Sequence, residues 1–203
     1  MAIFLIRHGE TALNAARVMQ PPDTPLSPHG QRQAARLGER LRGEGVGAIL
    51  ASDYARAAMT ASAVQRSTGA PLAYEPLLRE RNFGELRGRP YASFDFNPFA
   101  AGYAPPDGES WEAFHARVDR AWKAVEQAAA ACPGNLAVVT HGLVCRSVVS
   151  RLVQLPPALA TQEPAWANTS LTVIEGRGAW EVRLLGCAAH LDPAEEAPEA
   201  GPA

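Results

Sequence analysis

The stretch that decides the fold is Ala2-Ile3-Phe4-Leu5-Ile6, which continues directly into Arg7-His8-Gly9-Glu10-Thr11. A continuous apolar run of this length is typical of a strand that is buried on both faces of a parallel sheet. The basic and imidazole side chains that follow stand at the carboxyl end of the strand. Ligands of open α/β sheets bind beyond this end of the strands. The opening stretch therefore predicts a buried strand that ends at a binding site.

Strands and helices alternate along the rest of the chain. Pro28 stands at the first position of one expected helix, where its missing N–H costs nothing. Apolar residues from Trp111 to Val125 recur at three- and four-residue steps, which predicts a long amphipathic helix that ends at Pro133-Gly134. We expect further strands at 48–52, 71–74, 136–140, 169–175 and 180–185, and further helices at 54–67 and 143–152. This alternation predicts an α/β fold, a three-layer αβα sandwich with a mostly parallel central sheet.

Charge and cysteine content exclude several classes of protein. The 19 basic and 21 acidic side chains leave a formal net charge of −2, so no net positive field would attract nucleic acid or a membrane surface. The longest apolar runs fall short of the ~18–20 residues that span a bilayer. The cysteines, Cys132, Cys145 and Cys187, show no close pairing, which is typical of a reducing compartment and predicts a cytoplasmic protein. We expect one domain over 1–185 and a disordered tail over 186–203, which holds three prolines and four acidic residues.

Two further strand ends carry groups of the same kind. Arg56 follows the strand expected at 48–52, one helical turn into the next helix, and His141-Gly142 follow the strand at 136–140. If these strands are near neighbours, about 4.8 Å apart, their end groups converge with Arg7 and His8 on one pocket. Arginine forks bind phosphate oxygens bidentately, and helix N-termini add backbone N–H groups. The pattern predicts a phosphate-binding pocket.

Four blocks in order along the chain carry a resemblance to a known family. They are Leu5–Thr11 with Asn14 three residues on, Ser52–Ala61, Leu78–Gly88 and Val139–Gly142. Over roughly residues 3–175 the chain thereby resembles the histidine phosphatase superfamily, and the resemblance implies the phosphoglycerate mutase-like fold. Among its members, the chain resembles the small phosphatases, which include α-ribazole phosphatase and broad-specificity enzymes.

The resemblance also implies roles for individual residues. His8 would be the nucleophile that attacks phosphorus and forms a phosphohistidine. Arg7, Arg56 and His141 would stabilise the charge on the equatorial phosphoryl oxygens. Glu80 would protonate the leaving oxygen and then take a proton from water. The implied enzyme is a metal-independent phosphomonoester hydrolase without a cofactor, because arginines and histidines supply the positive charge.

Several assignments stay open at this stage. Asn14 and Gly142 join the expected phosphate-binding residues, the former as a neutral hydrogen-bond donor. Glu85 lies near Glu80 and is an alternative proton donor. Asp53 is expected to cap the helix at 54–67.

Hydrolysis and phosphoryl transfer between substrates need different surroundings. The expected cap segment, 89–110, has Arg89 as its only basic residue, beside three acidic and five aromatic residues. This composition favours a phosphatase over a mutase, which needs basic groups for a second anion. Arg81, directly after Glu80, resembles the mutase pattern, where it would contact a substrate carboxylate, so a phosphomutase is the alternative. A catalytically inactive phosphate-recognition module is a third hypothesis. The expected partner is a small phosphomonoester, and the expected state is a monomer or homodimer.

Overall fold

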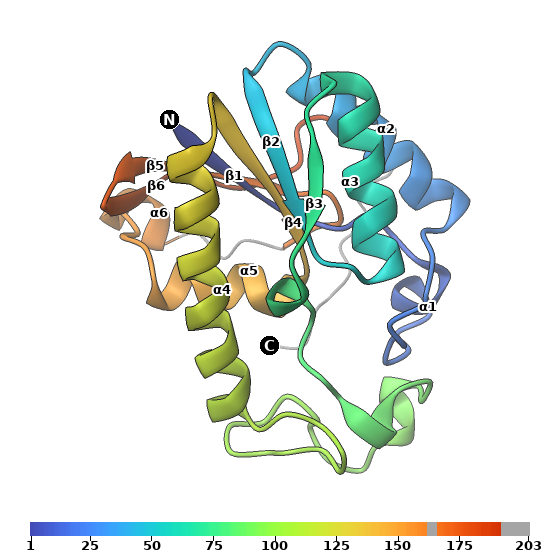
Figure 1. The fold of residues 1–203 in the computed structure, drawn as a ribbon. Coiled ribbons are helices and arrows are strands. Elements are labelled where there is room, and N and C mark those ends of the chain that lie inside the picture. Colours follow the sequence, from blue (N-terminus) through green and yellow to red (C-terminus); the bar gives the residue numbers. More distant parts are fainter. Residues whose placement is uncertain (162–165, 192–203) are drawn as a thin grey trace.

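A six-stranded sheet forms the centre of the fold (Figure 1). The computed structural model describes residues 1–161 and 166–191. The strands lie in the order β3-β2-β4-β1-β5-β6. Their bounds are β1 Ala2–Arg7, β2 Val46–Ala51, β3 Leu72–Tyr74, β4 Asn135–Thr140, β5 Leu171–Arg177 and β6 Ala179–Cys187. The first four strands in this order are parallel, whereas β5 runs antiparallel to β1 and to β6. The predicted mostly parallel sheet is confirmed.

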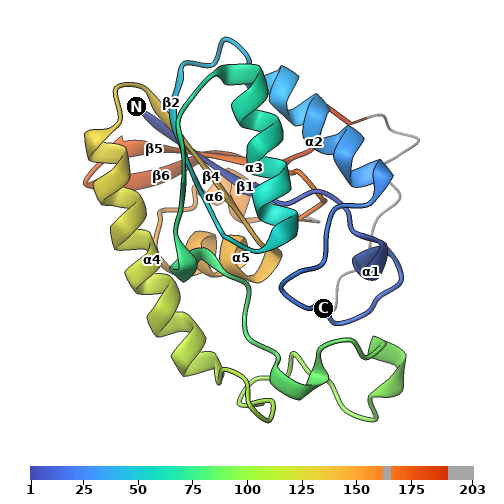
Figure 2. The same cartoon turned by 45° about the vertical axis from the view of Figure 1, so that its right-hand side comes forward.

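Helices cover both faces of the sheet, as Figures 1 and 2 show. Helices α2 and α3 pack on one face, and α4, α5 and α6 pack on the other. The helices are α1 Ala12–Ala15, α2 Pro28–Leu41, α3 Ala55–Thr68, α4 Trp111–Ala131, α5 Gly142–Arg151 and α6 Pro157–Ala160, and three short 3-10 helices are η1 Pro76–Leu78, η2 Gly84–Leu86 and η3 Tyr91–Ser93. The three-layer αβα sandwich is therefore confirmed. Within the described ranges, no helix combines the length and the apolar character needed to cross a membrane.

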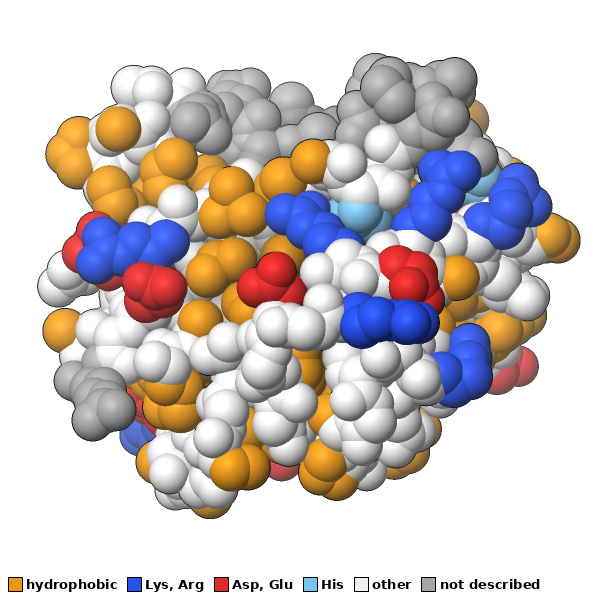
Figure 3. Space-filling view, turned by 90° about the horizontal axis from the view of Figure 1, so that it is seen from above, with side chains coloured by type: hydrophobic (Ala, Val, Ile, Leu, Met, Phe, Trp, Pro, Cys, Tyr) orange, Lys and Arg blue, Asp and Glu red, His pale blue; other side chains and the backbone are white. Residues whose placement is uncertain are grey.

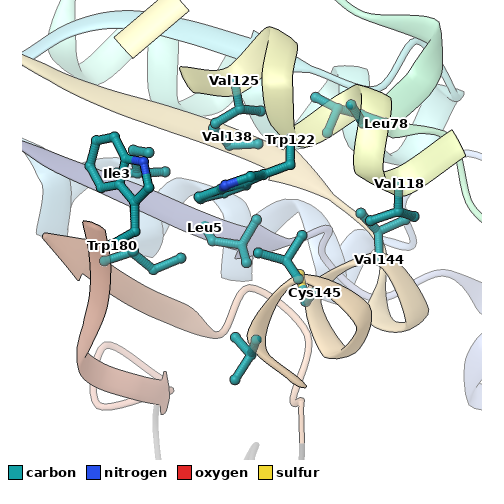
Figure 4. Close-up of a cluster of buried hydrophobic side chains, with 14 of the residues drawn as sticks. Ile3, Leu5, Leu78, Val118, Trp122, Val125, Val138, Val144, Cys145 and Trp180 are labelled. Atoms are coloured by element: carbon teal, nitrogen blue, oxygen red, sulfur yellow. The ribbon is translucent and has the colours of Figure 1, made fainter. Parts of the chain in front are cut away.

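Strand β1 divides its side chains between two hydrophobic cores. Ile3 and Leu5 belong to the core under α4 and α5, which Figure 4 shows, whereas Phe4 and Ile6 belong to the core under α2 and α3. Successive side chains of a strand point to opposite faces of the sheet. Only a continuous apolar run can therefore place apolar side chains in the cores on both faces. Each fully buried side chain of this kind contributes about 1.5–3 kcal/mol to folding.

The helix starts show one confirmed expectation and one error. Pro28 is the first residue of α2, and the side chain of Ser27 accepts a hydrogen bond from the Gly30 N–H. Asp53 was expected to cap the next helix, but Tyr54 is its N-cap residue and makes no capping bond. The Asp53 carboxylate instead accepts two hydrogen bonds from the Arg79 guanidinium. A charged, two-donor partner competes successfully with a single backbone N–H.

The cap is the excursion between η1 and α4, residues 79–110, and it is longer than the 89–110 expected. Its aromatic side chains pack on one another: the ring centroid of Phe99 lies 5.4 Å from that of Phe83 and 5.6 Å from that of Tyr91. Together with Met19 they form a small core of their own. The cap segment itself lies below the sheet in Figure 1. Part of the aromatic content of the cap therefore holds the cap together.

The chain remains packed beyond residue 185, where the tail was expected to begin. β6 continues to Cys187, which pairs with Leu171 of β5. His190 lies between the Arg40 guanidinium, at 3.0 Å, and the Thr169 hydroxyl, also at 3.0 Å. The boundary of the expected tail is thus wrong for residues 186–191. The pairing of β6 with β5 and the contact of His190 with Arg40 of α2 hold this stretch against the rest of the fold. The rest of the expected tail, 192–203, lies outside the described residues.

Candidate active site

His8 occupies the carboxyl end of β1 and is 3% exposed. Its Nδ1 lies 2.7 Å from the carbonyl of Gly9, to which it donates, and its Nε2 accepts a hydrogen bond from Nε of Arg56 at 3.3 Å. Burial and the charges of Arg56 and Arg7 hold the pKa of His8 well below its usual range. The imidazole is therefore neutral at pH 7, and its Nε2 carries a lone pair and no proton.

The backbone around His8 is held by distant segments. The His8 carbonyl accepts hydrogen bonds from the Asn168 side chain at 3.0 Å and from the Thr169 N–H at 3.2 Å. Gly9 packs so closely on Gly30 that a Cβ there would lie 2.7 Å from the Gly30 carbonyl oxygen. Only glycine allows this approach, which brings α2 against the loop after β1.

Arg56 and Arg7 place positive charge beside His8. Arg56, on the first turn of α3, is 2% exposed, and its Nη1 donates to the Pro21 carbonyl at 3.0 Å. Burial lowers its pKa to about 10, so it stays charged at pH 7. Arg7 is oriented by a hydrogen bond from its Nη1 to the carbonyl of Trp166. The structure brings Arg7, His8 and Arg56 together on the wall of one cavity, which is described below.

His141 follows β4 and stands next to the nucleophile, because β1 and β4 pair with Arg7 opposite Thr140. The ring centroids of His8 and His141 are 5.1 Å apart. Burial and the charge of Arg56 hold the pKa of His141 well below its usual range. Its Nε2 lies 2.9 Å from the Ser52 hydroxyl, whereas its buried Nδ1 has no hydrogen-bond partner in the described part of the chain. His141 is fully buried and is not among the residues that line the cavity described below, so its contact with a phosphate group stays a prediction.

Glu80 is the carboxyl group of the site. Its Oε1 accepts a hydrogen bond from the Arg81 N–H at 2.9 Å, and its Oε2 accepts one from the N–H of Leu143, at the start of α5, at 3.2 Å. Burial raises its pKa above the ordinary value of a glutamate, and the hydrogen bonds and Arg56 oppose this only in part. Glu85, the alternative proton donor, is exposed and does not line the cavity described below.

The structure places the other expected residues as follows. Asn14, on α1, is buried, and its Nδ2 donates to Oδ1 of Asn168 at 3.0 Å.

Arg81 is 1% exposed: its Nε donates to the Glu109 carbonyl at 3.1 Å and its Nη2 to the Tyr103 carbonyl at 2.6 Å. These bonds join separate parts of the cap, whereas the buried Nη1 of Arg81 has no hydrogen-bond partner among the described residues, and Arg81 lines the cavity described below. Gly142 begins α5 and lines the cavity.

A cavity of about 710 Å³ lies over these residues, between the sheet end, the cap, α1, α4 and α5. Its described lining contains seven arginines and two glutamates: Arg7, Arg17, Arg56, Arg81, Arg87, Arg146, Arg151, Glu10 and Glu80. Aromatic side chains form much of the remaining wall: Tyr54, Phe83, Tyr91, Phe99, Trp111, Phe114 and Trp166. The cavity lining thus has more basic than acidic side chains. At the end of the molecule away from the cap, in contrast, basic and acidic side chains lie next to one another (Figure 3). Among the described residues, no three His, Cys, Asp or Glu side chains are placed to hold a metal ion.

The segment 166–170 is the part of the site that the sequence did not reveal. Trp166 and Thr169 have left-handed backbone conformations, with φ of 47° and 57°, which non-glycine residues adopt rarely. These conformations turn backbone and side-chain groups of the segment toward Arg7 and His8. The sequence offered only Asn168-Thr169-Ser170, a glycosylation-like triplet, which carries no signal for this role.

Comparison with known proteins identifies the family to which the chain belongs. The sequence model of the histidine phosphatase superfamily (branch 1) matches residues 3–187. The "Probable phosphoglycerate mutase GpmB" of Yersinia enterocolitica is 32% identical and the match covers 95% of each chain. The phosphoglycerate mutase of Bacillus anthracis has a structure similar to this one, with a TM-score of 0.78, 27% identity and 94% of each chain covered. A mycobacterial glucosyl-3-phosphoglycerate phosphatase solved with VO3 has a TM-score of 0.78 at 26% identity, covering 92% of this chain and 99% of its own. The chain belongs to the histidine phosphatase superfamily.

Proposed function

We propose that the chain hydrolyses phosphomonoesters through a phosphohistidine intermediate on His8, without a metal ion. The observation that carries the proposal is the hydrogen bond from Arg56 to Nε2 of His8, because it requires an unprotonated, nucleophilic nitrogen. Glu80 lines the same cavity, and its raised pKa favours the protonated form that an acid catalyst needs. Membership of the superfamily and the phosphatase among the structural neighbours support this reading.

The reaction proceeds in two displacements. In the first, the lone pair of Nε2 of His8 forms a bond to phosphorus as the bond to the ester oxygen breaks, and the Glu80 carboxyl gives its proton to that oxygen. In the second, water attacks phosphorus, Glu80 takes a proton from the water, and the bond to His8 breaks. Arg7 and Arg56 balance the charge on the phosphoryl oxygens in both steps, which is the main task of a phosphoryl-transfer site.

The cavity is larger than a phosphate group requires, so the alcohol part of the substrate is also enclosed. Its wall above the site is formed by cap and α4 residues such as Phe99, Tyr91 and Trp111. We propose a leaving group that contains a ring or an apolar part. These rings also pack on one another, so they serve the cap as well as the substrate.

A phosphomutase is the second candidate, and one observation favours it. Arg17, Arg87 and Arg146 lie on the cavity wall, and Arg146 makes no ion pair or hydrogen bond with any described residue. Such cations could bind a second anionic group of a substrate, as a mutase requires. The curated and solved relatives include phosphoglycerate mutases as well as a phosphatase.

The test compares the wild type with His8→Ala in the presence of EDTA. Release of nitrophenolate from para-nitrophenyl phosphate should survive chelation and vanish with His8→Ala. A matched variant, His29→Ala on α2 outside the cavity, should keep full activity. Incubation with 3-phosphoglycerate separates the candidates, because a phosphatase frees inorganic phosphate and a mutase yields the isomer. Full activity of His8→Ala would refute the covalent mechanism.

We further propose a cytoplasmic enzyme for a small-molecule substrate, acting as a monomer or homodimer without nucleic-acid or membrane partners. The absence of a disulfide among the three cysteines, all of which lie in the described part of the chain, supports a reducing compartment. The net charge of −2 gives no general attraction for polyanions.

A further inference from the structure

The carboxyl of Glu80 is carried by a segment, residues 79–82, that belongs to no helix or strand. Backbone carbonyls in such a segment need donors from other parts of the chain. Arg117 of α4 supplies them. Its Nη1 donates to the carbonyls of Leu77 and Arg79, both at 2.7 Å, and its Nη2 donates to the carbonyl of Glu80 at 3.2 Å. One guanidinium thus fixes three carbonyls at and before Glu80.

Glu109 holds the same segment from the other side. Its two carboxylate oxygens accept hydrogen bonds from Nε and Nη2 of Arg117, each at 2.7 Å, and Oε2 also accepts one from the Asn82 N–H at 2.8 Å. Burial raises the pKa of Glu109, but the bonds from Arg117 and Asn82 outweigh it and leave the pKa below its ordinary value. Glu109 therefore stays ionised at pH 7. Bidentate pairs of this kind are strong and have a fixed geometry.

The side chain of Glu80 depends on this arrangement. Within the described ranges, its oxygens are held only by the N–H groups of Arg81 and Leu143, so the carboxyl is placed as accurately as the backbone that carries those groups. α5 fixes Leu143, whereas Arg81 lies within the segment that Arg117 and Glu109 hold. A misplacement of about 1 Å in a reacting group can cost around 100-fold in rate.

We propose that the Arg117–Glu109 pair positions Glu80 for proton transfer to the leaving oxygen. Arg117 does not line the cavity, and its side chain is 12% exposed, so it acts through the backbone of 79–82 and not on the substrate. Glu109 is the residue before the N-cap of α4, so the pair also joins the two ends of the cap. The inference rests on the proposed hydrolysis with Glu80 as the acid.

The choice of leaving group separates positioning from mere stabilisation of the fold. Nitrophenolate leaves without a proton, whereas an alkoxide needs one from Glu80. The ratio of kcat/KM for an alkyl phosphate to that for para-nitrophenyl phosphate therefore reports proton donation in the first displacement. A variant that is only partly folded loses both activities equally, so the ratio stays constant.

The experiment measures this ratio for the wild type, Glu80→Gln, Arg117→Met, Arg117→Lys, Glu109→Gln and Arg120→Met. Glu80→Gln removes the acid altogether, so it gives the largest expected effect: kcat/KM for the alkyl ester should fall by about 10²–10⁴. Arg117→Met and Glu109→Gln should lower the ratio by about 10–100-fold. Arg117→Lys keeps the charge but not the fork, so its effect should be smaller. Arg120→Met, an exposed arginine on the same helix, should leave the ratio unchanged.

Each outcome bears on one proposal or both. A lowered ratio in the Arg117 and Glu109 variants, absent when Glu80→Gln is already present, supports positioning, because interactions that act through one residue are non-additive. An unchanged ratio in Arg117→Lys and Glu109→Gln, with a lowered ratio in Glu80→Gln, overturns the positioning role alone. If circular dichroism shows that Arg117→Met does not fold, the ratios measured for Arg117→Lys and Glu109→Gln decide whether the pair positions Glu80. A wild type that hydrolyses neither ester overturns the proposed hydrolysis and this inference together.

Discussion

Nε of Arg56 donates a hydrogen bond to Nε2 of His8 across 3.3 Å, so a cation faces the nitrogen that we propose as the nucleophile. This contact explains two properties at once. It keeps the imidazole neutral, because a proton on Nε2 would meet a positive charge. It also holds the guanidinium where the phosphoryl oxygens will arrive.

Arg56→Met should therefore lower kcat for para-nitrophenyl phosphate by about 10²–10³, the cost of losing a preorganised donor. Arg56→Lys should recover only part of this loss, because an ammonium cannot form a bidentate contact. Arg66→Met, at an exposed position on the same helix, is the matched control and should behave as wild type. Equal activities of the Arg56 and Arg66 variants would contradict the role of Arg56.

The pH dependence of kcat/KM for an alkyl phosphate, whose leaving oxygen needs a proton, should be bell-shaped. His8 must be neutral to attack, and its pKa is lowered, so activity is lost only as pH falls well below the usual range of histidine titration. Glu80 must be protonated in the first step, and its pKa is raised by burial, so activity is lost as pH rises through that raised value. Steady-state rates across the pH range measure both limbs. In Glu80→Gln the basic limb should disappear while the acid limb remains.

Glu80→Gln and Glu85→Gln make a matched pair, since both replace a carboxyl group by an amide in the same stretch of chain. Glu80→Gln should lose about 10²–10⁴ in kcat/KM on an alkyl phosphate, because its amide has no proton of suitable acidity to give. Glu85→Gln should be unaffected, because Glu85 is exposed on η2 and outside the cavity. The reverse result would make Glu85 the acid.

Leu5→Ala should destabilise the fold by about 2–5 kcal/mol, because it leaves a cavity in the core under α4 and α5. Urea denaturation followed by circular dichroism measures this free energy of unfolding. Phe96→Ala, which truncates a side chain 41% exposed in the cap, should change it by no more than about 0.5 kcal/mol. A Leu5→Ala protein as stable as Phe96→Ala would mean that β1 is not held between two cores.

Sequence alone predicted the parts of the molecule that local patterns encode. The apolar run before Arg7 and the strand before His141 predicted two buried strands, and the structure shows that these strands are neighbours whose ends bring His8 and His141 together. The role of Asp53 was predicted wrongly, because its partner Arg79 lies 26 positions away. Asn168 was missed for the same reason, since its contact with the His8 carbonyl joins residues 160 positions apart. Contacts of this range leave no periodicity in the chain.

The antiparallel direction of β5 has a consequence for the order in which the site is assembled. Because β5 runs against β1, its first residue, Leu171, lies beside Ile6, and the segment before it reaches His8. His8 follows the first strand of the sheet, but its carbonyl is held by Asn168, which lies 160 positions further along the chain, and by the adjacent Thr169. A chain in which β5 is not yet paired with β1 can carry Arg7 and His8 at the end of a strand, yet it lacks the donors that hold the His8 carbonyl and the carbonyl that orients Arg7. The pairing of β5 with β1 is therefore the folding step that completes the surroundings of His8.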